Sequence, residues 1–515
     1  MFQLFRERPR AEHLLLVAIG FVFLFCLLTL NVPAISGDEA VYTFILEEGR
    51  RLLSGGGASL NPLIGYTGPL DFWVMGAVYG ILVSPDLLAP QPWMVRIIPF
   101  SIFWIGAFVL FREVRVLRDN ARPDRETFPL WFLLLAASCP MVLIWSHVGF
   151  PHPMLLGLFA YFVAESFRIA RTGEVRWIRL ALLAGFSTEA HTTAFLGHLI
   201  VFLPVITLLG KAARRNPGKA ALAVTIYLAL AFPVLKNFPP PASAHGEQAR
   251  SLGDELIAFF SIMAGHQPFR FLLHVEPVPR IAVLGFLIFL LTVFFRYVTG
   301  LFREARSFAR PSYLWIWRRV FLAHLLGTFF LLVMSYRGRS LTFIGHERYF
   351  LPLVPGWTLF WADALWKFLP KRRGWICSAV IAYFFLQFSI PILKYSAEQD
   401  PSMLAARWLE KECPRERCVA STLDFWSYWP LRYYLRGSFG KVDLNLQTPT
   451  WKPIEEFPRK GRELGGCWLA GTEEDFARIR SRIPGRKRAE LFIPLQDAAS
   501  GGYACFAGIE ALYWP

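Results

Sequence analysis

The chain has 515 residues, of which 55% are hydrophobic and 16% aromatic, and it carries 16 more basic than acidic side chains. Ordinary soluble domains are about 45–50% apolar, so this composition excludes a soluble globular protein and indicates a polytopic membrane protein. The positive charge does not indicate a nucleic-acid partner. Arginines and lysines cluster between apolar runs, where the cytoplasmic bias of basic loops already accounts for them.

The apolar runs predict helices that cross the membrane, each about 20 residues long. The eleven candidate spans lie near residues 12–31, 94–112, 128–146, 153–169, 177–190, 194–210, 220–236, 280–298, 319–336, 349–367 and 374–393. The first run follows Arg6, Arg8 and Arg10 and has no clear small-residue cleavage site. We therefore expect a retained anchor with a cytoplasmic N-terminus.

Basic segments between the apolar runs predict the orientation. They are residues 6–10, 112–125, 168–179, 211–219, 296–319 and 371–373. If all are cytoplasmic, residues 32–93 form a first external loop and residues 237–279 a second, with a short helix at 252–263. The apolar stretch at 69–84 has about 16 residues, which is too few to cross, so we expect an interfacial helix on the external surface.

The tail, residues 394–515, changes character. Its helix-like segment PSMLAARWLEKE and its strand-like segments RCVAST, CWLAG and YACFAG predict a small soluble α/β domain outside the membrane, after a transmembrane domain at residues 1–393. Cys413, Cys418, Cys467 and Cys505 lie in this tail. An even number of cysteines in an oxidising compartment favours disulfides. We prefer the pairs Cys413–Cys418 and Cys467–Cys505, although the spacing does not decide the connectivity.

Two adjacent acids, Asp38 and Glu39, follow the first span in the stretch NVPAISGDEAVYTF. Ser36 and Glu39 have the S-x-x-E spacing of a capping box, so Glu39 has a structural explanation. For Asp38 two interpretations stay open. It either gains about 0.3–1 kcal/mol from a helix dipole, or it is partly desolvated beside the bilayer and acts as a general base.

A second group of polar residues lies between two late spans, at RGRSLTFIGHERYF. Arg337, Arg339 and Arg348 are predicted to be external, against the usual bias of basic residues, so they need another partner. A lipid phosphate is a natural one, because arginine offers it a bidentate fork. The alternatives are ordinary lipid headgroups or a pair between Arg348 and Glu347. The sequence has no Walker motif, dinucleotide fingerprint or HExxH motif, so nothing indicates ATP or a nucleotide sugar.

Four stretches carry a family resemblance. They are GDEAVY at 37–42, GYTGPLDFW at 65–73, MVRIIPFSIFWIGAF at 94–108 and ERYFLPLVP at 347–355. On these stretches the chain resembles the GT-C superfamily of integral membrane glycosyltransferases, in the branch of protein O-mannosyltransferases, lipid A aminoarabinose transferases and Rgt-type galacturonosyl transferases. The resemblance implies a GT-C-like fold and an inverting transfer of sugar from a polyprenyl-phosphate carrier to a lipid, glycan or protein acceptor on the extracytoplasmic side.

The resemblance also implies roles for single residues. By position Asp38 matches the catalytic acid, with Glu39, Tyr42 and His152 supporting the acceptor. The family's aromatic-Lys-Pro-Pro-Leu stretch aligns with Tyr66 to Leu70, where Gly68 and Pro69 replace the basic residue and the first proline. Residues expected to bind the carrier phosphate are Tyr66, Arg96, Arg270, Arg337, Arg339, Arg348 and Tyr349. No cofactor is certain, and the use of a divalent metal stays open.

Two other classes of protein fit many apolar spans. A lipid or solute transporter or flippase is the main alternative, but transporters place ionisable groups near the bilayer midplane and show internal repeats, whereas the charges here gather at one face. A structural or polymer-assembly protein would leave Asp38 as a cap. We expect an integral protein of a bacterial inner membrane, with membrane lipids, a donor and an acceptor as partners and no nucleic acid.

Overall fold

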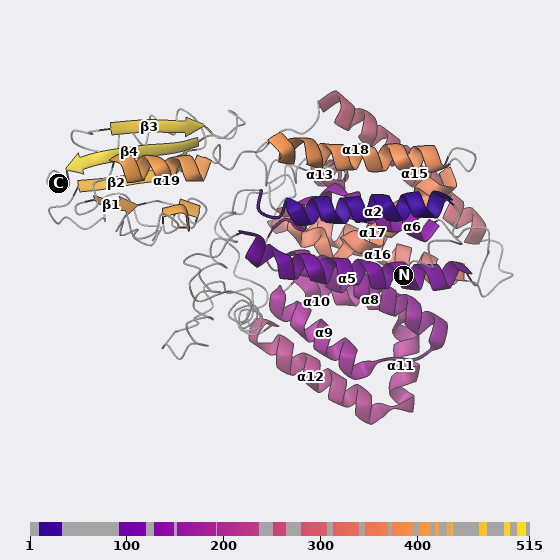
Figure 1. Ribbon diagram of the computed structural model, residues 1–515. Helices are drawn as coiled ribbons and strands as arrows, with labels where there is room; N and C mark the ends of the chain where they lie inside the picture. Colours follow the sequence, from indigo (N-terminus) through magenta and orange to yellow (C-terminus); the bar gives the residue numbers. More distant parts are fainter. Residues whose placement is uncertain are drawn as a thin grey trace.

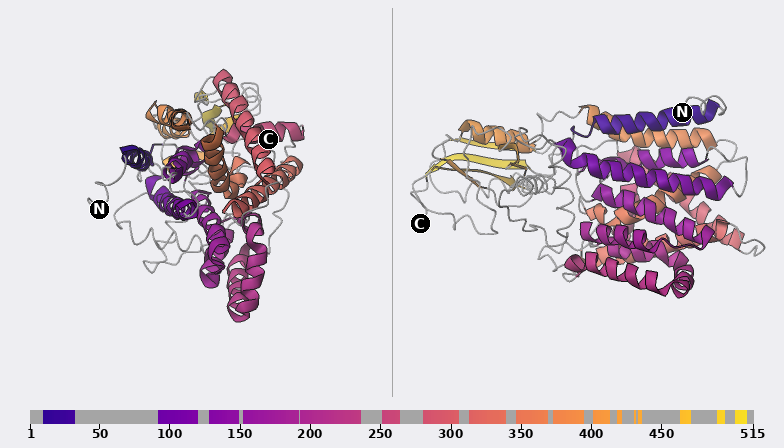
Figure 2. Two further views of the ribbon diagram at one scale, coloured as in Figure 1. Left: turned by 90° about the vertical axis from the view of Figure 1, so that its right-hand side faces the viewer. Right: turned by 60° about the horizontal axis from the view of Figure 1, so that its bottom comes forward.

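The computed structural model describes a helical bundle and a small sheet (Figure 1). The residues that it describes are 10–32, 92–119, 128–148, 152–191, 193–235, 251–263, 280–305, 313–338, 346–368, 373–394 and 401–412, and in the rest of the tail 418–421, 430–431, 433–435, 463–470, 489–494 and 502–510. Long helices lie side by side, and the sheet lies beyond the end of the bundle at which α18 (Arg373–Lys394) ends (Figures 1 and 2).

Helices make up the described part of the first 394 residues. They are α2 (Arg10–Leu28), α5 (Pro92–Asp119), α6 (Phe128–Ser138), α7 (Pro140–Trp145), α8 (His152–Thr172), α9 (Trp177–Ala190), α10 (Thr193–Phe202), the 3-10 helix η2 (Leu203–Val205), α11 (Ile206–Arg215), α12 (Pro217–Leu235), α13 (Leu252–Met263), α15 (Arg280–Ala305), α16 (Tyr313–Gly338), the 3-10 helix η3 (His346–Leu353), α17 (Val354–Phe368) and α18 (Arg373–Lys394).

Each predicted span falls on helical structure, in some cases on more than one element, and the predicted short helix at 252–263 is α13. Within the described residues, five segments are long and apolar enough by themselves to cross a membrane: Arg96–Leu117, Thr193–Arg215, Pro217–Leu235, Trp315–Val333 and Gly374–Leu393. Shorter apolar helices lie at Glu12–Leu28, Phe128–Ser138 and Leu284–Gly300. Helices at the predicted places are thus confirmed, whereas eleven crossings stay a prediction.

The predicted span at 128–146 is wrong in one respect, because it is two helices. The first, α6, ends at Ser138, and α7 begins at Pro140 after the extended residue Cys139. Proline has no N–H to donate to the preceding turn, and its ring favours the first position of a new helix. Helix α7 ends at Trp145, and His147 in the turn that follows lies beside Thr29 at the end of α2.

Glycines let the helices α5 and α8 approach each other closely. A methyl group on Gly106 would overlap the backbone of Gly157, and one on Gly157 would overlap the backbone of Ile102. Contact between small residues is how membrane helices gain van der Waals energy, since lipid offers no hydrophobic drive to their association. The pair therefore holds α5 and α8 together through the middle of α5.

The tail forms a mixed sheet with one helix packed against it. The strands β1 (Cys418–Ser421), β2 (Glu463–Ala470), β3 (Ala489–Pro494) and β4 (Gly502–Glu510) lie in the order β1-β2-β4-β3, with β1 and β2 parallel and the other pairs antiparallel. Helix α19 (Pro401–Glu412) packs on β2, β3 and β4. The predicted helix and three predicted strands are confirmed, whereas the sequence analysis did not predict β3.

The cysteines divide as predicted between the two regions. Within the helices, Cys26, Cys139 and Cys377 are buried thiols that are not joined in disulfides. In the sheet, Cys505 is disulfide-bonded, and its neighbour across the β2–β4 ladder is Cys467. That register favours the predicted pair of Cys467 with Cys505, while Cys413 lies outside the described residues.

Candidate functional site

A buried arginine fixes the point where the chain leaves α2. Arg96, in the second turn of α5, is 0% exposed, and its Nη1 donates a hydrogen bond of 2.7 Å to the backbone oxygen of Leu30. The last carbonyl groups of a helix have no partner within the helix, so a charged donor there stabilises the helix end. Arg96 thus ties the end of α2 to the start of α5.

A histidine holds the same helix end from the other side. His147, in the turn after α7, is 0% exposed and lies with its Nε2 3.0 Å from the hydroxyl oxygen of Thr29. Its Nδ1 lies 2.6 Å from the backbone oxygen of Leu143. A carbonyl oxygen only accepts, so Nδ1 carries the hydrogen. The ring of Phe388 on α18, with its centroid 4.7 Å away, covers the imidazole.

These contacts join three helices at one point. The backbone N–H of Trp93, in the first turn of α5, donates to the side-chain oxygen of Asn31 at 3.3 Å. Asn31 therefore satisfies one of the free N–H groups at the start of α5, as a capping side chain does. The end of α2 is bound to both α5 and the turn after α7, a few residues before the two acids singled out from the sequence, which lie outside the described residues.

The predicted site residues differ in how much the structure says about them. Asp38, Glu39, Tyr42, Tyr66, Arg270 and Arg339 lie outside the described residues. The backbone is described for His152 at the start of α8, for Arg337 in the last turn of α16, and for Arg348 and Tyr349 in η3, but not their side chains. Among the predicted site residues, Arg96 is the one whose side-chain contacts can be compared with its assigned role. Its hydrogen bond to Leu30 is a positioning contact.

The short helix η3 lies at the same end of the bundle as the α2 junction. Its Phe350 contacts Phe259 of α13 with ring centroids 5.5 Å apart, and α13 also packs against α7, the helix that ends beside Thr29. The S-x-x-D spacing of Ser251 and Asp254 starts α13, because the amide of Asp254 donates to the Ser251 hydroxyl at 3.1 Å. Tertiary packing therefore brings the segment of Arg348 toward the exit of α2.

Two polar networks at the opposite end of the bundle were missed in the sequence analysis. Asp363 on α17 accepts from the Tyr297 hydroxyl at 2.9 Å and pairs with Lys367 at 3.0 Å. Glu165 on α8 pairs with Arg168, three residues further on. Acids within apolar spans are costly unless paired, so Glu165 and Asp363 were the sequence signal that could have found these networks.

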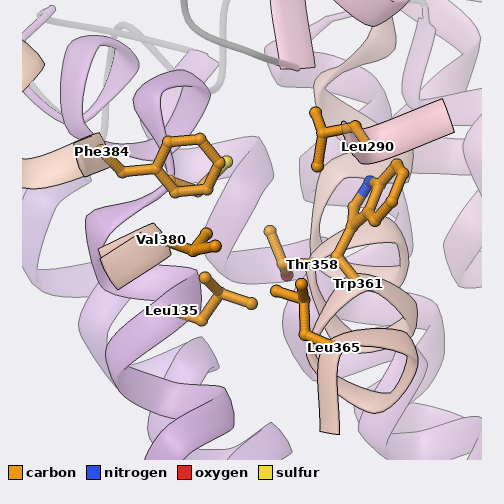
Figure 3. Close-up of a pocket in the computed structure, with 8 residues that line it drawn as sticks. Leu135, Leu290, Thr358, Trp361, Leu365, Val380 and Phe384 are labelled. Carbon is orange, nitrogen blue, oxygen red and sulfur yellow. The ribbon is translucent and has the colours of Figure 1, made fainter. Parts of the chain in front are cut away.

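A void of about 20 Å³ between α6, α15, α17 and α18 is lined by side chains such as Leu135, Trp361 and Phe384 (Figure 3). The hydroxyl of Thr358 at its edge bonds to its own helix, at the backbone oxygen of Pro355. An apolar void of this size has room for at most one water molecule, which is far too little for a sugar substrate. Among the described residues, no three His, Cys, Asp or Glu side chains come together as metal ligands.

Comparison with solved structures identifies proteins with a similar fold. No protein-family model matches the chain, and no curated protein does. The structure of ArnT from Cupriavidus metallidurans bound to undecaprenyl phosphate matches with a TM-score of 0.58 and 12% identity, over 98% of this chain and all of that one. The apo structure of the same protein matches with a TM-score of 0.59 and 13% identity, over equal shares.

A third solved structure is more distant. The oligosaccharyltransferase of Archaeoglobus fulgidus, in complex with zinc and sulfate, gives a TM-score of 0.45 and 12% identity over 81% of this chain and 61% of that one, which is too low to carry an argument. The likeness to ArnT covers the helical bundle and the tail together. Apolar helices and this likeness indicate an integral membrane protein with the fold of ArnT.

Proposed function

We propose that the chain is a membrane glycosyltransferase that moves a sugar from a polyprenyl-phosphate-linked donor to a lipid, glycan or protein acceptor. The observation that carries this proposal is the match to ArnT over 98% of the chain, one of the two ArnT structures being bound to undecaprenyl phosphate. A lipid-linked donor needs no nucleotide-binding motif, and the sequence contains none. Because fold alone does not establish function, the proposal also assigns roles to residues at and after the exit of α2.

The proposed chemistry is an in-line displacement. The carboxylate of Asp38 takes the proton from an acceptor hydroxyl, the acceptor oxygen attacks the anomeric carbon, and the bond from that carbon to the phosphate oxygen breaks. The carrier phosphate departs with the negative charge, which Arg337, Arg339 and Arg348 neutralise, with support from Tyr66, Arg270 and Tyr349. Attack from the face opposite the leaving group inverts the anomeric centre.

In this mechanism the contacts of Arg96 and His147 at the exit of α2 position the base. A base must be held within hydrogen-bonding reach of the acceptor, and an error of about 1 Å lowers the rate strongly. Arg96 and His147 bind Leu30 and Thr29, which lie within ten residues of Asp38 in the sequence. Arg96 then acts through the backbone of α2, in addition to its positive charge near the departing phosphate.

The test uses purified full-length protein in proteoliposomes with a panel of polyprenyl-phosphate sugars and acceptor lipids. We expect acceptor-dependent release of carrier phosphate, and a loss of about 100-fold or more in Asp38→Asn, the scale that general-base catalysis supplies. Asp254→Asn is the matched control, since Asp254 is a carboxylate at the start of another helix in a predicted external loop. It should keep full activity.

The outcomes separate the function from the role of one residue. Activity that survives in Asp38→Asn would indicate that Asp38 is a helix cap and not the base, and it would not contradict the proposed glycosyl transfer. If no donor in the panel releases carrier phosphate, and the protein instead moves a labelled lipid across the vesicle membrane, the transporter alternative replaces the proposal.

A further inference from the structure

An apolar groove lies on the side of the bundle between α2 and α18, at the end away from the sheet. We propose that it binds an anionic phospholipid, with the acyl chains in the groove and the headgroup at the basic residues that begin both helices. The proposal does not depend on the function proposed above. It concerns the half of the bundle opposite the exit of α2.

Contacts at one end of the two helices create the groove. Figures 1 and 2 show α2 and α18 side by side along the bundle. Phe385 of α18 contacts Phe21 and Phe25 of α2, with ring centroids 5.7 and 5.1 Å apart. These contacts involve the later halves of both helices. Toward their first residues the helices leave a cavity of about 630 Å³.

The walls and floor of the cavity are apolar. Leu14 and Ala18 line it from α2, and Ser378 and Ala382 from α18, while Trp131 of α6 and Trp366 of α17 also line it. Small side chains on the two walls leave the space open. Leu14 is 71% exposed and Phe21 58%, so the groove opens on the outer surface of the bundle. For an integral membrane protein, acyl chains are the apolar molecules that meet this surface.

Charge at the open end indicates the kind of lipid. Helix α2 begins at Arg10 and α18 at Arg373. Directly before them the sequence has Arg6 and Arg8, and Lys371 and Arg372, while the acids in these stretches are Glu7 and, in the first turn of α2, Glu12. Basic residues at the ends of membrane helices attract anionic headgroups, and the attraction falls off within a Debye length. Because α2 and α18 begin at the same end of the bundle (Figure 1), this excess of basic residues favours a headgroup with a net negative charge over a zwitterionic one.

The experiment measures which lipid stays with the protein. The full-length chain is reconstituted in vesicles of equal amounts of phosphatidylglycerol and phosphatidylcholine with a trace of undecaprenyl phosphate, extracted in mild detergent and analysed by native mass spectrometry. We expect one phosphatidylglycerol per chain, retained about tenfold over phosphatidylcholine. Ala382→Trp fills the groove and should abolish retention, whereas Ala379→Trp, on the same helix but outside the groove lining, should keep it.

A second pair of variants tests the headgroup. Replacing Lys371, Arg372 and Arg373 by Gln should keep a bound lipid but remove the preference for phosphatidylglycerol. The matched control replaces Lys211, Arg214 and Arg215 by Gln, at the exposed end of α11, and should keep the preference. If Ala382→Trp does not elute as a single species on size exclusion, Ala18→Phe fills the groove from the other wall.

Three results would overturn the proposal. One is equal retention by Ala382→Trp and the unchanged chain. Another is equal retention of phosphatidylglycerol and phosphatidylcholine by the unchanged chain. The third is retention of undecaprenyl phosphate in place of phosphatidylglycerol, which would assign the groove to a single-chain carrier lipid.

Discussion

The two ends of the helical bundle stabilise buried polar groups in different ways. At the end beside the sheet, Arg96 donates to the carbonyl of Leu30 and His147 bonds to Thr29, so the contacts described there fix backbone at the exit of a helix. At the opposite end Asp363 and Glu165 pair with Lys367 and Arg168, four and three residues away in the same helices, and Asp363 also accepts from Tyr297 of α15. These two charged pairs therefore lie within one helix, whereas the charged side chain of Arg96 bonds to the backbone that follows another helix.

This difference predicts which end governs activity. Substitution at the sheet end should displace the loop that leaves α2 and lower the rate of transfer. Substitution at the opposite end should lower stability and leave the rate of the folded protein unchanged. The three predictions below run from the largest expected effect to the smallest.

Removing Arg96 should have the largest effect. We expect Arg96→Leu to lower carrier-phosphate release about 100-fold, because a displaced base loses its reach to the acceptor, and to lower the free energy of unfolding by about 2 kcal/mol through the lost charged hydrogen bond. Arg96→Lys keeps the charge and one donor and should recover part of the rate. Rates in proteoliposomes and thermal unfolding in detergent measure the two effects. Full activity in the folded leucine variant would contradict the positioning role.

Removing the buried carboxylate at the opposite end should act on stability. Asp363→Leu leaves Lys367 and the Tyr297 hydroxyl without their acceptor, and breaking such a pair costs about 3 kcal/mol. Asp363→Asn keeps an acceptor for Tyr297 and should cost less. Thermal unfolding gives the stability, and turnover at a permissive temperature should match the unchanged chain. A fall in turnover as large as that of Arg96→Leu would remove the distinction between the two ends.

The smallest effect is expected at Thr29. Thr29→Val removes the hydroxyl within 3.0 Å of His147, and a single hydrogen bond in a folded protein contributes about 1 kcal/mol. We expect a small fall in the unfolding midpoint and a change of a few fold in turnover. Thr225→Val is the control, because the Thr225 hydroxyl is exposed and bonds to Ala221 of its own helix. If both valine variants behave alike, the Thr29–His147 contact does not position the loop.

Much of the secondary structure could be predicted from the sequence. Apolar runs place the membrane helices, because lipid requires every backbone group to be bonded within its own segment. The amphipathic helix at 401–412 and three of the strands were found in the same way. The remaining strand, β3 (AELFIP, 489–494), is short and ends in proline. Its pairing with β4 is a contact between strands that the local sequence pattern does not show.

The candidate site was predictable as a set of residues, and less so as a geometry. Arg96 was named as a phosphate ligand from its place at the start of a span, but the sequence does not show that its Nη1 meets the carbonyl of Leu30, 66 residues earlier. Thr29 lies in an apolar run, and nothing in the sequence marks it as a residue that positions the site. His147 follows an apolar run in the sequence, and only packing reveals that it is bound to Thr29 and covered by Phe388.

By itself the sequence determined that this chain is a membrane protein built of apolar helices, and where those helices lie. It also indicated polar residues whose place beside a membrane span needs a structural or functional explanation. These follow from local composition, since water and lipid act on each segment independently. Tertiary structure alone decided that α5 and the turn after α7 bond to the end of α2. It also decided that α2 and α18 contact each other in their later halves and leave a cavity between their first halves. Such features depend on contacts between segments far apart in the chain, whose free energy exists only once the helices are packed.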